Sequence, residues 1–238
     1  MTFGMLRIKN EARWIADVVR SMSPMCGRII VLDDHSTDAT PLICRDLGCD
    51  VHASQFDGID EARDKNHMVD LIRAQGKPGD WVLCIDGDEV LEAADIPLLQ
   101  SEMNAAAAAL SLRVMYLWDS PDQVRVDGVY GRFRRPSAFR LGDLSDQFRA
   151  TRYGNGANLH CSSVPWVAAQ SAAPSAARLW HLGYMDRADR LRKYAWYNAI
   201  DPANDFEDRY RHCVQGDIPE VPAYLPLRHA GPLKLEAR

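Results

Sequence analysis

The chain has 238 residues, of which 47% are hydrophobic and 26% are charged, a composition typical of a globular protein and not of a disordered one. Its formal charge is 28 minus 33, or -5, which argues against a protein whose whole surface binds polyanions. No apolar run reaches the roughly 18 residues of a membrane span, and the N-terminus lacks the pattern of a signal peptide. We therefore expect a cytoplasmic protein.

The first half of the chain alternates segments that are typical of strands and helices. Strands are expected at residues 5–8, 28–32, 51–53 and 81–85. Helices are expected from an N-cap at Asn10, from a cap at Ser36 or Thr37 to a stop at Gly48, and over residues 59–74. Such alternation predicts right-handed crossovers and a mainly parallel sheet, in which ligands bind beyond the carboxyl ends of the strands.

The second half of the chain is less regular. Residues 110–118 are expected to form a long strand, and residues 124–141 an antiparallel strand or hairpin with one basic face. Residues 187–200 carry arginine, lysine, tyrosine and tryptophan in a pattern that predicts a basic, aromatic helix. We find no internal repeat and no linker, so we expect a single domain.

Two aspartates, Asp86 and Asp88, follow the apolar run at residues 81–85. Carboxylates at the end of a buried strand suit a hard divalent cation such as Mg²⁺ or Mn²⁺, which completes its shell with water and substrate phosphates. Two other polar groups, at residues 9–11 and 33–36, follow expected strands that end at the same edge of the sheet. A simple polar turn is the alternative interpretation of each group taken alone.

Four motifs in this order carry a resemblance to a known family: Lys9 to Ala12, Ile29 to Thr40, Ala62 to Asn66 and Gly79 to Glu89. With them the chain resembles the family-2 glycosyltransferases of the GT-A fold, of the small bacterial type that assembles sugar-polymer cores. The resemblance implies an α/β fold with a mainly parallel central sheet flanked by helices and a C-terminal antiparallel and helical cover. Residues 1–92 would form a nucleotide-binding half, and residues 93–238 an acceptor half with the helical cover.

The resemblance also implies a reaction, the inverting transfer of a sugar from a nucleotide-diphosphate sugar to an acceptor hydroxyl. The donor would be a UDP- or GDP-sugar, and the cofactor Mn²⁺ or Mg²⁺. The donor would be held by Asn10, Glu11, Asp33, Asp34, Arg63, Asp86 and Arg132, and the metal by Asp86, Asp88 and His181. Each residue also has a structural interpretation, such as a helix cap for Asp33 and Asp34, a surface ion pair for Arg63 or a core position for His181.

An inverting transfer needs a carboxylate that takes a proton from the acceptor hydroxyl. Close relatives often place glutamate after the histidine that corresponds to His160, but Cys161 stands there in this chain. Asp143 and Asp146 lie between the basic strand and His160, and they are the expected candidates for the catalytic base.

Two other functions fit part of the pattern. Residues 82–90 also match the nucleophile motif of haloacid-dehalogenase-like phosphohydrolases, although three motif-bearing elements precede Asp86 here and no lysine follows it before Lys193. A non-catalytic nucleotide-binding module is the third interpretation. For a transferase, the expected acceptor is a saccharide, a lipid-linked sugar or a hydroxylated base in nucleic acid.

Overall fold

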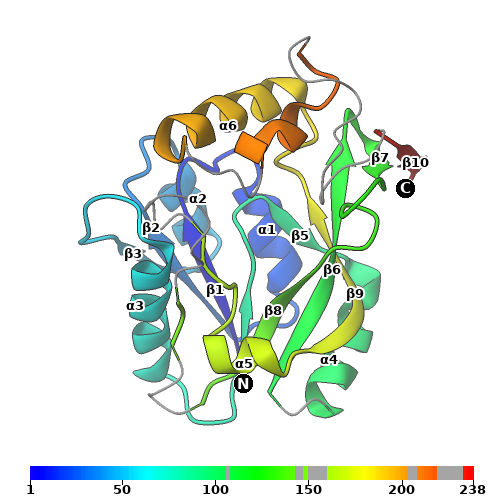
Figure 1. The fold of residues 1–238 in the computed structure, drawn as a ribbon. Helices are drawn as coiled ribbons and strands as arrows, with labels where there is room; N and C mark the ends of the chain where they lie inside the picture. The colour runs from blue at the N-terminus through cyan, green and yellow to red at the C-terminus, as the bar shows by residue number, and fades with distance from the viewer. Residues whose placement is uncertain (106–107, 143–146, 150–159, 203–207, 219–232) are drawn as a thin grey trace.

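A computed structural model describes residues 1–105, 108–142, 147–149, 160–202, 208–218 and 233–238 of the chain (Figure 1). In this part of the chain one mixed sheet has the strand order β10-β7-β6-β8-β4-β1-β2-β3. Off this order, β9 pairs with β6, and β5 pairs with β9. Its strands are β1 (Thr2–Ile8), β2 (Arg28–Asp33), β3 (Asp50–Ala53), β4 (Trp81–Cys84), β5 (Glu89–Leu91), β6 (Ala109–Trp118), β7 (Ser120–Arg125), β8 (Arg134–Arg140), β9 (Ala173–His181) and β10 (Leu235–Ala237).

Helices cover the sheet and its upper edge in Figure 1. The helices are α1 (Ile15–Met22), α2 (Thr40–Asp46), α3 (Glu61–Arg73), α4 (Ile96–Ala105), α5 (Trp166–Gln170) and α6 (Arg187–Ile200), with short 3-10 helices η1 (Ala93–Asp95) and η2 (Asp208–Val214). The helix expected at residues 187–200 is therefore confirmed with its bounds.

Three parallel pairings come from the N-terminal half, as the alternation of strands and helices predicted, and β6 and β9 in the C-terminal half also pair in parallel. β1 pairs in parallel with β2 and β4, and β2 pairs in parallel with β3. β8 pairs antiparallel with β4 and β6, and β7 pairs antiparallel with β6. The predicted fold class, an α/β fold with a parallel core sheet and a C-terminal antiparallel and helical cover, is confirmed.

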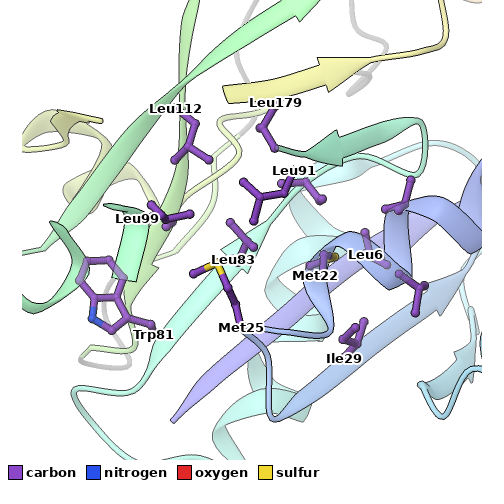
Figure 2. Close-up of a cluster of buried hydrophobic side chains, with 14 of the residues drawn as sticks. Leu6, Met22, Met25, Ile29, Trp81, Leu83, Leu91, Leu99, Leu112 and Leu179 are labelled. Carbon is purple, nitrogen blue, oxygen red and sulfur yellow. The ribbon is translucent and has the colours of Figure 1, made fainter. Parts of the chain in front are cut away.

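The parallel strands are buried on both faces, which explains why they are nearly continuous apolar runs. One face of β1 packs Leu6 and Ile8 against α1 in the core that Figure 2 shows, where Leu6 and Met22 are labelled. The opposite face packs Phe3 and Met5 against α3. With helices on both faces, the ends of the strands are the open positions of this sheet.

Two expected helix starts were wrong. Asn10 does not cap a helix, because its φ is +56° and α1 begins at Ile15. The Asn10 side chain instead accepts a hydrogen bond of 2.8 Å from the Thr37 backbone N–H. Neither Ser36 nor Thr37 caps α2, which begins at Thr40, whose backbone N–H donates to Asp38. Both errors have one cause: polar side chains at these strand ends connect two loops to each other instead of capping the next helix.

Residues 124–141 do not form a hairpin with one basic face. β7 and β8 lie on opposite sides of β6 and do not pair with each other. Arg125 is fully buried in an ion pair with Asp127. Arg135 instead contacts the acidic turn that follows β4. The antiparallel strand that was the other expectation is present as β8, but two of the arginines neutralise carboxylates inside the protein.

α6 lies across the end of the sheet where β1 and β2 end, at the top of Figure 1. Arg13 connects the loop after β1 to the first turn of α6 through ion pairs with Asp186 and Asp189. None of the helices in the described parts of the chain is both long and apolar enough to cross a membrane.

Candidate active site

A cavity of about 940 Å³ opens at the carboxyl ends of the parallel strands. Its wall combines the polar residues that follow β1, β2 and β4 with residues from β9 and α6. Its lining includes Asn10, Glu11, Asp34, Glu61, Asp86, Asp88, Glu89, Arg135, His160, Cys161, His181, Lys193 and Trp196. The structure therefore brings together Asn10, Glu11, Asp34, Asp86, Asp88 and His181, six of the residues predicted from sequence.

Asp34 is fixed at the cavity wall by a buried ion network. Arg7 Nη2 lies 2.9 Å from Asp34 Oδ2, and Arg7 Nε lies 2.8 Å from Asp64 Oδ2. Lys9 adds a longer contact of 3.6 Å to Asp34. The sequence analysis missed Arg7, although an arginine inside an otherwise apolar strand is the signal that could have identified it. Arg7 therefore fixes the orientation of the Asp34 carboxylate where β1 and β2 end.

The predicted residues Asp33, Arg63 and Arg132 do not line this cavity. Asp33 accepts a hydrogen bond from the Ser36 backbone N–H at 3.3 Å, so it shapes the turn after β2. Arg63 donates to Asp64 at 2.9 Å and to the carbonyl of Gly58 at 3.0 Å, and stacks over the ring of Phe56. The ion pair expected for Arg63 is therefore present, with Asp64 as its partner.

Arg135, not Arg132, is the arginine that reaches the acidic turn after β4. Its guanidinium contacts Asp86 at 2.6 Å and also donates to Glu89. Burial raises the pKa of Asp86, but the charges of Arg135 and Lys65 outweigh that effect and hold the pKa below its usual range. Glu89 is fully buried, and burial raises its pKa to about 7 despite Arg135. A single guanidinium is thus shared by two carboxylates.

Asp88 lies beside this pair and contacts groups from two other elements. Lys193 Nζ of α6 is 2.5 Å from Asp88 Oδ2, and His181 Nε2 at the end of β9 is 3.7 Å from the same oxygen. Burial would raise the pKa of Asp88, but Lys193 and His181 lower it well below its usual range. Burial lowers the pKa of His181 to about 4, so its ring is neutral near pH 7. Lys193 was not predicted from the sequence.

Four carboxylates, those of Glu11, Asp86, Asp88 and Glu89, line the cavity at or beside the turn after β4. Burial, followed by repulsion from Asp88, raises the pKa of Glu11 to about 8. Burial is the largest cause of both raised pKa values, and the negative charges of Asp86 and Asp88 add to it. A divalent cation bound here would relieve that repulsion.

The donor set fits Mn²⁺ or Mg²⁺ as a cation that needs a substrate to complete its shell. Among the described residues no three His, Cys, Asp or Glu side chains converge as a complete metal site. Asp88 and His181 converge as two donors, and the Nδ1 atom of His181 is buried with no hydrogen-bond partner in the described chain. One or two protein ligands suffice for Mg²⁺ when substrate phosphates supply others, and an imidazole suits Mn²⁺.

A second group of polar side chains lines the cavity near the start of α3. Cys161 Sγ lies 3.7 Å from Glu61 Oε2, and Lys65 Nζ lies 3.5 Å from the same oxygen. His160 Nε2 is 3.0 Å from the Tyr210 hydroxyl, which donates to Asp201 at 2.8 Å. Asp143 and Asp146, the predicted bases, lie outside the described residues.

The fold and this cavity define an α/β protein with an acidic site at the ends of its parallel strands. The sequence profile described as "Glycosyl transferase family 2" matches residues 8–159. The chain belongs to this glycosyltransferase family, which confirms the resemblance of its four motifs. No curated protein matches the chain.

Solved structures of glucosyl-3-phosphoglycerate synthase from Mycobacterium tuberculosis are similar to the chain. The complex with Mn²⁺, UDP-glucose and phosphoglyceric acid is 22% identical, with a TM-score of 0.38, over 49% of this chain and 44% of that chain. The complex with UDP is 18% identical, with a TM-score of 0.45, over 67% and 62% of the two chains. The chain thus spans less than two thirds of the length of these enzymes, and a similarity this distant carries no argument about its substrate.

Proposed function

We propose that this protein transfers a sugar from a nucleotide-diphosphate sugar to an acceptor hydroxyl and needs a divalent cation to do so. The observation that carries the proposal is the convergence of Asp34, Asp86, Asp88 and His181 on one cavity at the strand ends. Family membership supports the reaction class, and the site chemistry supports the cation. Residues 1–92 would bind the donor, and residues 93–238 would bind the acceptor and supply the helical cover.

The donor's nucleoside would lie against the ends of β1 and β2. Asp34, held by Arg7, presents a fixed carboxylate that could accept hydrogen bonds from the N–H edge of a uracil or guanine base. Asn10 and Glu11 line the same side of the cavity. Asp33 and Arg63 act in this proposal by shaping the turn and the helix start around Asp34, and Asp86 would reach the ribose and the metal.

The cation would be held by Asp88 and His181, with Asp86 beside them, and it would neutralise the negative charge that develops on the diphosphate leaving group. Arg135 keeps Asp86 ionised and turned toward the cavity, because its guanidinium holds one oxygen of that carboxylate at 2.6 Å. Arg132 remains a predicted contact to the diphosphate, although the neighbouring Arg134 and Arg135 line the cavity.

Inversion requires a base on the acceptor side. Asp143 and Asp146 remain predictions from the sequence. Glu61 is a further candidate among the described residues, because it lines the cavity and its side chain is 25% exposed. It also lies next to Cys161, where close relatives of the family often have glutamate. A carboxylate from α3 would then perform the proton transfer that Cys161 cannot perform.

The acceptor would enter beside α6. Trp196 lines the cavity with 44% of its surface exposed, and Arg192 lines it one turn earlier on the helix. An exposed indole beside a guanidinium suits a saccharide or a lipid-linked sugar with an anionic group. A hydroxylated base in nucleic acid is less favoured, because Arg125 and Arg135 of the expected basic strip are committed to carboxylates.

A panel of nucleotide sugars tests the proposal. Purified protein with Mn²⁺ is expected to release UDP or GDP from one member of the panel, faster when the correct acceptor is added. Rapid hydrolysis of a general phosphomonoester without release of a nucleoside diphosphate would favour the phosphohydrolase interpretation. Cation-dependent binding of a nucleotide, with no turnover of any sugar in the panel, would favour the non-catalytic module.

A further inference from the structure

One oxygen of Asp88 is faced by two different groups. The ammonium of Lys193 lies 2.5 Å from Asp88 Oδ2, and the Nε2 atom of His181 lies 3.7 Å from it. The proposed metal would bind between Asp88 and His181. The position of the metal and the position of the ammonium are therefore both set by the same carboxylate oxygen.

The ammonium and a divalent cation cannot share this position. A metal bonded to a carboxylate oxygen at about 2.0–2.1 Å would lie within a few ångströms of an ammonium on the same oxygen. Two cations that close repel each other strongly in a buried site, where water screens little. Gly183 closes another side, because a Cβ built there would overlap both Asp88 Oδ2 and Lys193 Nζ. A divalent cation at this position on Asp88 Oδ2 would therefore displace the ammonium.

Lys193 can leave Asp88 without movement of its helix. Arg190, one turn earlier on α6, is 1% exposed and anchors the helix through Asp217 at 2.6 Å and Asp119 at 2.7 Å. It also donates to the carbonyl oxygen of Tyr184 at 2.8 Å. The lysine side chain has a flexible four-carbon stem, so rotation of that stem alone would move the ammonium.

We propose that Lys193 is a displaceable counter-cation that couples metal binding to donor binding. Without metal it neutralises Asp88. When a metal binds Asp88, the lysine side chain rotates, and its ammonium moves into the cavity and binds the diphosphate of the nucleotide. This inference rests on the proposed function, since the diphosphate belongs to the donor. It extends that function by adding a lysine that exchanges one anionic partner for another.

The exchange has a thermodynamic consequence. Metal alone binds weakly, because it must displace an ammonium that then lacks an anionic partner. A nucleotide diphosphate supplies that partner, so it strengthens metal binding, and the metal strengthens nucleotide binding by the same factor. An uncharged residue in place of Lys193 removes the cation that competes with the metal for Asp88. It also removes the ammonium that would bind the diphosphate of the nucleotide.

The test is a titration of wild type and Lys193→Met with Mn²⁺, by calorimetry and by electron paramagnetic resonance of free Mn²⁺. Each protein is titrated alone, with UDP and with GDP. Lys193→Met is expected to bind Mn²⁺ alone about tenfold tighter than wild type. The factor by which the preferred nucleotide strengthens Mn²⁺ binding is expected to fall at least about fivefold in the variant, within the usual range of coupling factors.

Two variants control for charge and shape. Arg187→Met removes one positive charge from the same helix, but Arg187 contacts the carbonyl of Asp217 and not Asp88, so Mn²⁺ affinity should stay at the wild-type value. Lys193→Arg keeps a cation and should keep weak Mn²⁺ binding. Lys193→Gln replaces the methionine variant if that protein does not fold.

Equal Mn²⁺ affinity in wild type and Lys193→Met, or weaker Mn²⁺ binding in the variant, would overturn the inference. Mn²⁺ binding that is undetectable in both proteins would overturn it as well. Failure of the proposed function gives a different result. In that case neither UDP nor GDP would bind wild type in the presence of Mn²⁺, whatever the variant does with the metal alone.

Discussion

Replacement of Gly183 by alanine is expected to distort the acidic site, because the added methyl group overlaps side chains of that site. A Cβ at this position overlaps Asp88 Oδ2 and Lys193 Nζ, and it lies 3.0 Å from Asp88 Cγ. The end of the lysine stem can move away, but Asp88 is 4% exposed and has little freedom to rotate. Either the Asp88 carboxylate is forced out of the orientation in which it faces His181, or the backbone at Gly183 shifts, and each change distorts the acidic site.

The expected loss of stability follows from the cost of placing one extra methyl group in a packed site. Overpacking of this kind costs about 1–3 kcal/mol. For a domain of 150–250 residues each kcal/mol lowers Tm by roughly 2–4 °C, so the variant should melt roughly 2–12 °C below wild type. The second expected effect is loss of the stabilisation that Mn²⁺ and the preferred nucleotide give together. At a ligand concentration of 100 times Kd that stabilisation is about 2.7 kcal/mol in wild type.

Thermal melting with and without Mn²⁺ and UDP or GDP measures both effects. Gly142→Ala is the matched control, because a Cβ there has only the carbonyl oxygen of Arg140 within 4 Å, at 3.9 Å among the described residues, and should leave both quantities unchanged. A Gly183→Ala protein with the wild-type Tm and the full rise in Tm on addition of Mn²⁺ and nucleotide would refute the packing argument.

Three further predictions concern the site and its surroundings. His181→Ala should weaken Mn²⁺ binding while Tm stays near the wild-type value, whereas a large fall in Tm with unchanged Mn²⁺ affinity would reveal a purely structural histidine. If Glu61 is the base, Glu61→Gln should lower turnover by about 10²- to 10⁴-fold with donor affinity intact, and a variant of wild-type rate would exclude it. Arg178 donates hydrogen bonds to Asp95 and lowers the pKa of that carboxyl, so the pair stabilises the fold above about pH 4 and loses this effect as the pH falls through the lowered pKa. Denaturant unfolding of wild type and Asp95→Asn should therefore differ at pH 7, and the difference should shrink as the pH falls from about 4 through the lowered pKa; a constant difference would contradict this assignment.

The parallel half of the fold was predictable because its signals are local. The apolar runs of β1, β2 and β4 and the helical spacing between them determine the order of elements, and the common direction of parallel strands places the ligand site at their carboxyl ends. The clustering of the polar residues at these strand ends could therefore be predicted from the order of elements alone. Where helices begin was less predictable, because Asn10 and Ser36 bond to each other's loops, a contact across 26 residues.

The residues missed by sequence reasoning are the cations that neutralise the site from a distance. Arg135 and Lys193 lie 49 and 105 residues from the carboxylates that they contact. No periodicity or motif links such positions, since only packing of β8 and α6 against the strand ends brings them together. The arginine-rich segments that form β8 and α6 have the composition of solvated faces. A sequence alone does not show which of their charges are paired and buried.

The central claim is that Asp88 makes nucleotide binding depend on a divalent cation. Calorimetry of UDP and GDP binding to wild type and Asp88→Asn, with Mn²⁺ and with chelator, tests it most directly. Wild type should bind one of the two nucleotides with Mn²⁺ and lose most of that affinity in chelator, and Asp88→Asn should bind it weakly in both conditions. An Asp88→Asn protein that binds the nucleotide and Mn²⁺ as tightly as wild type would contradict the account.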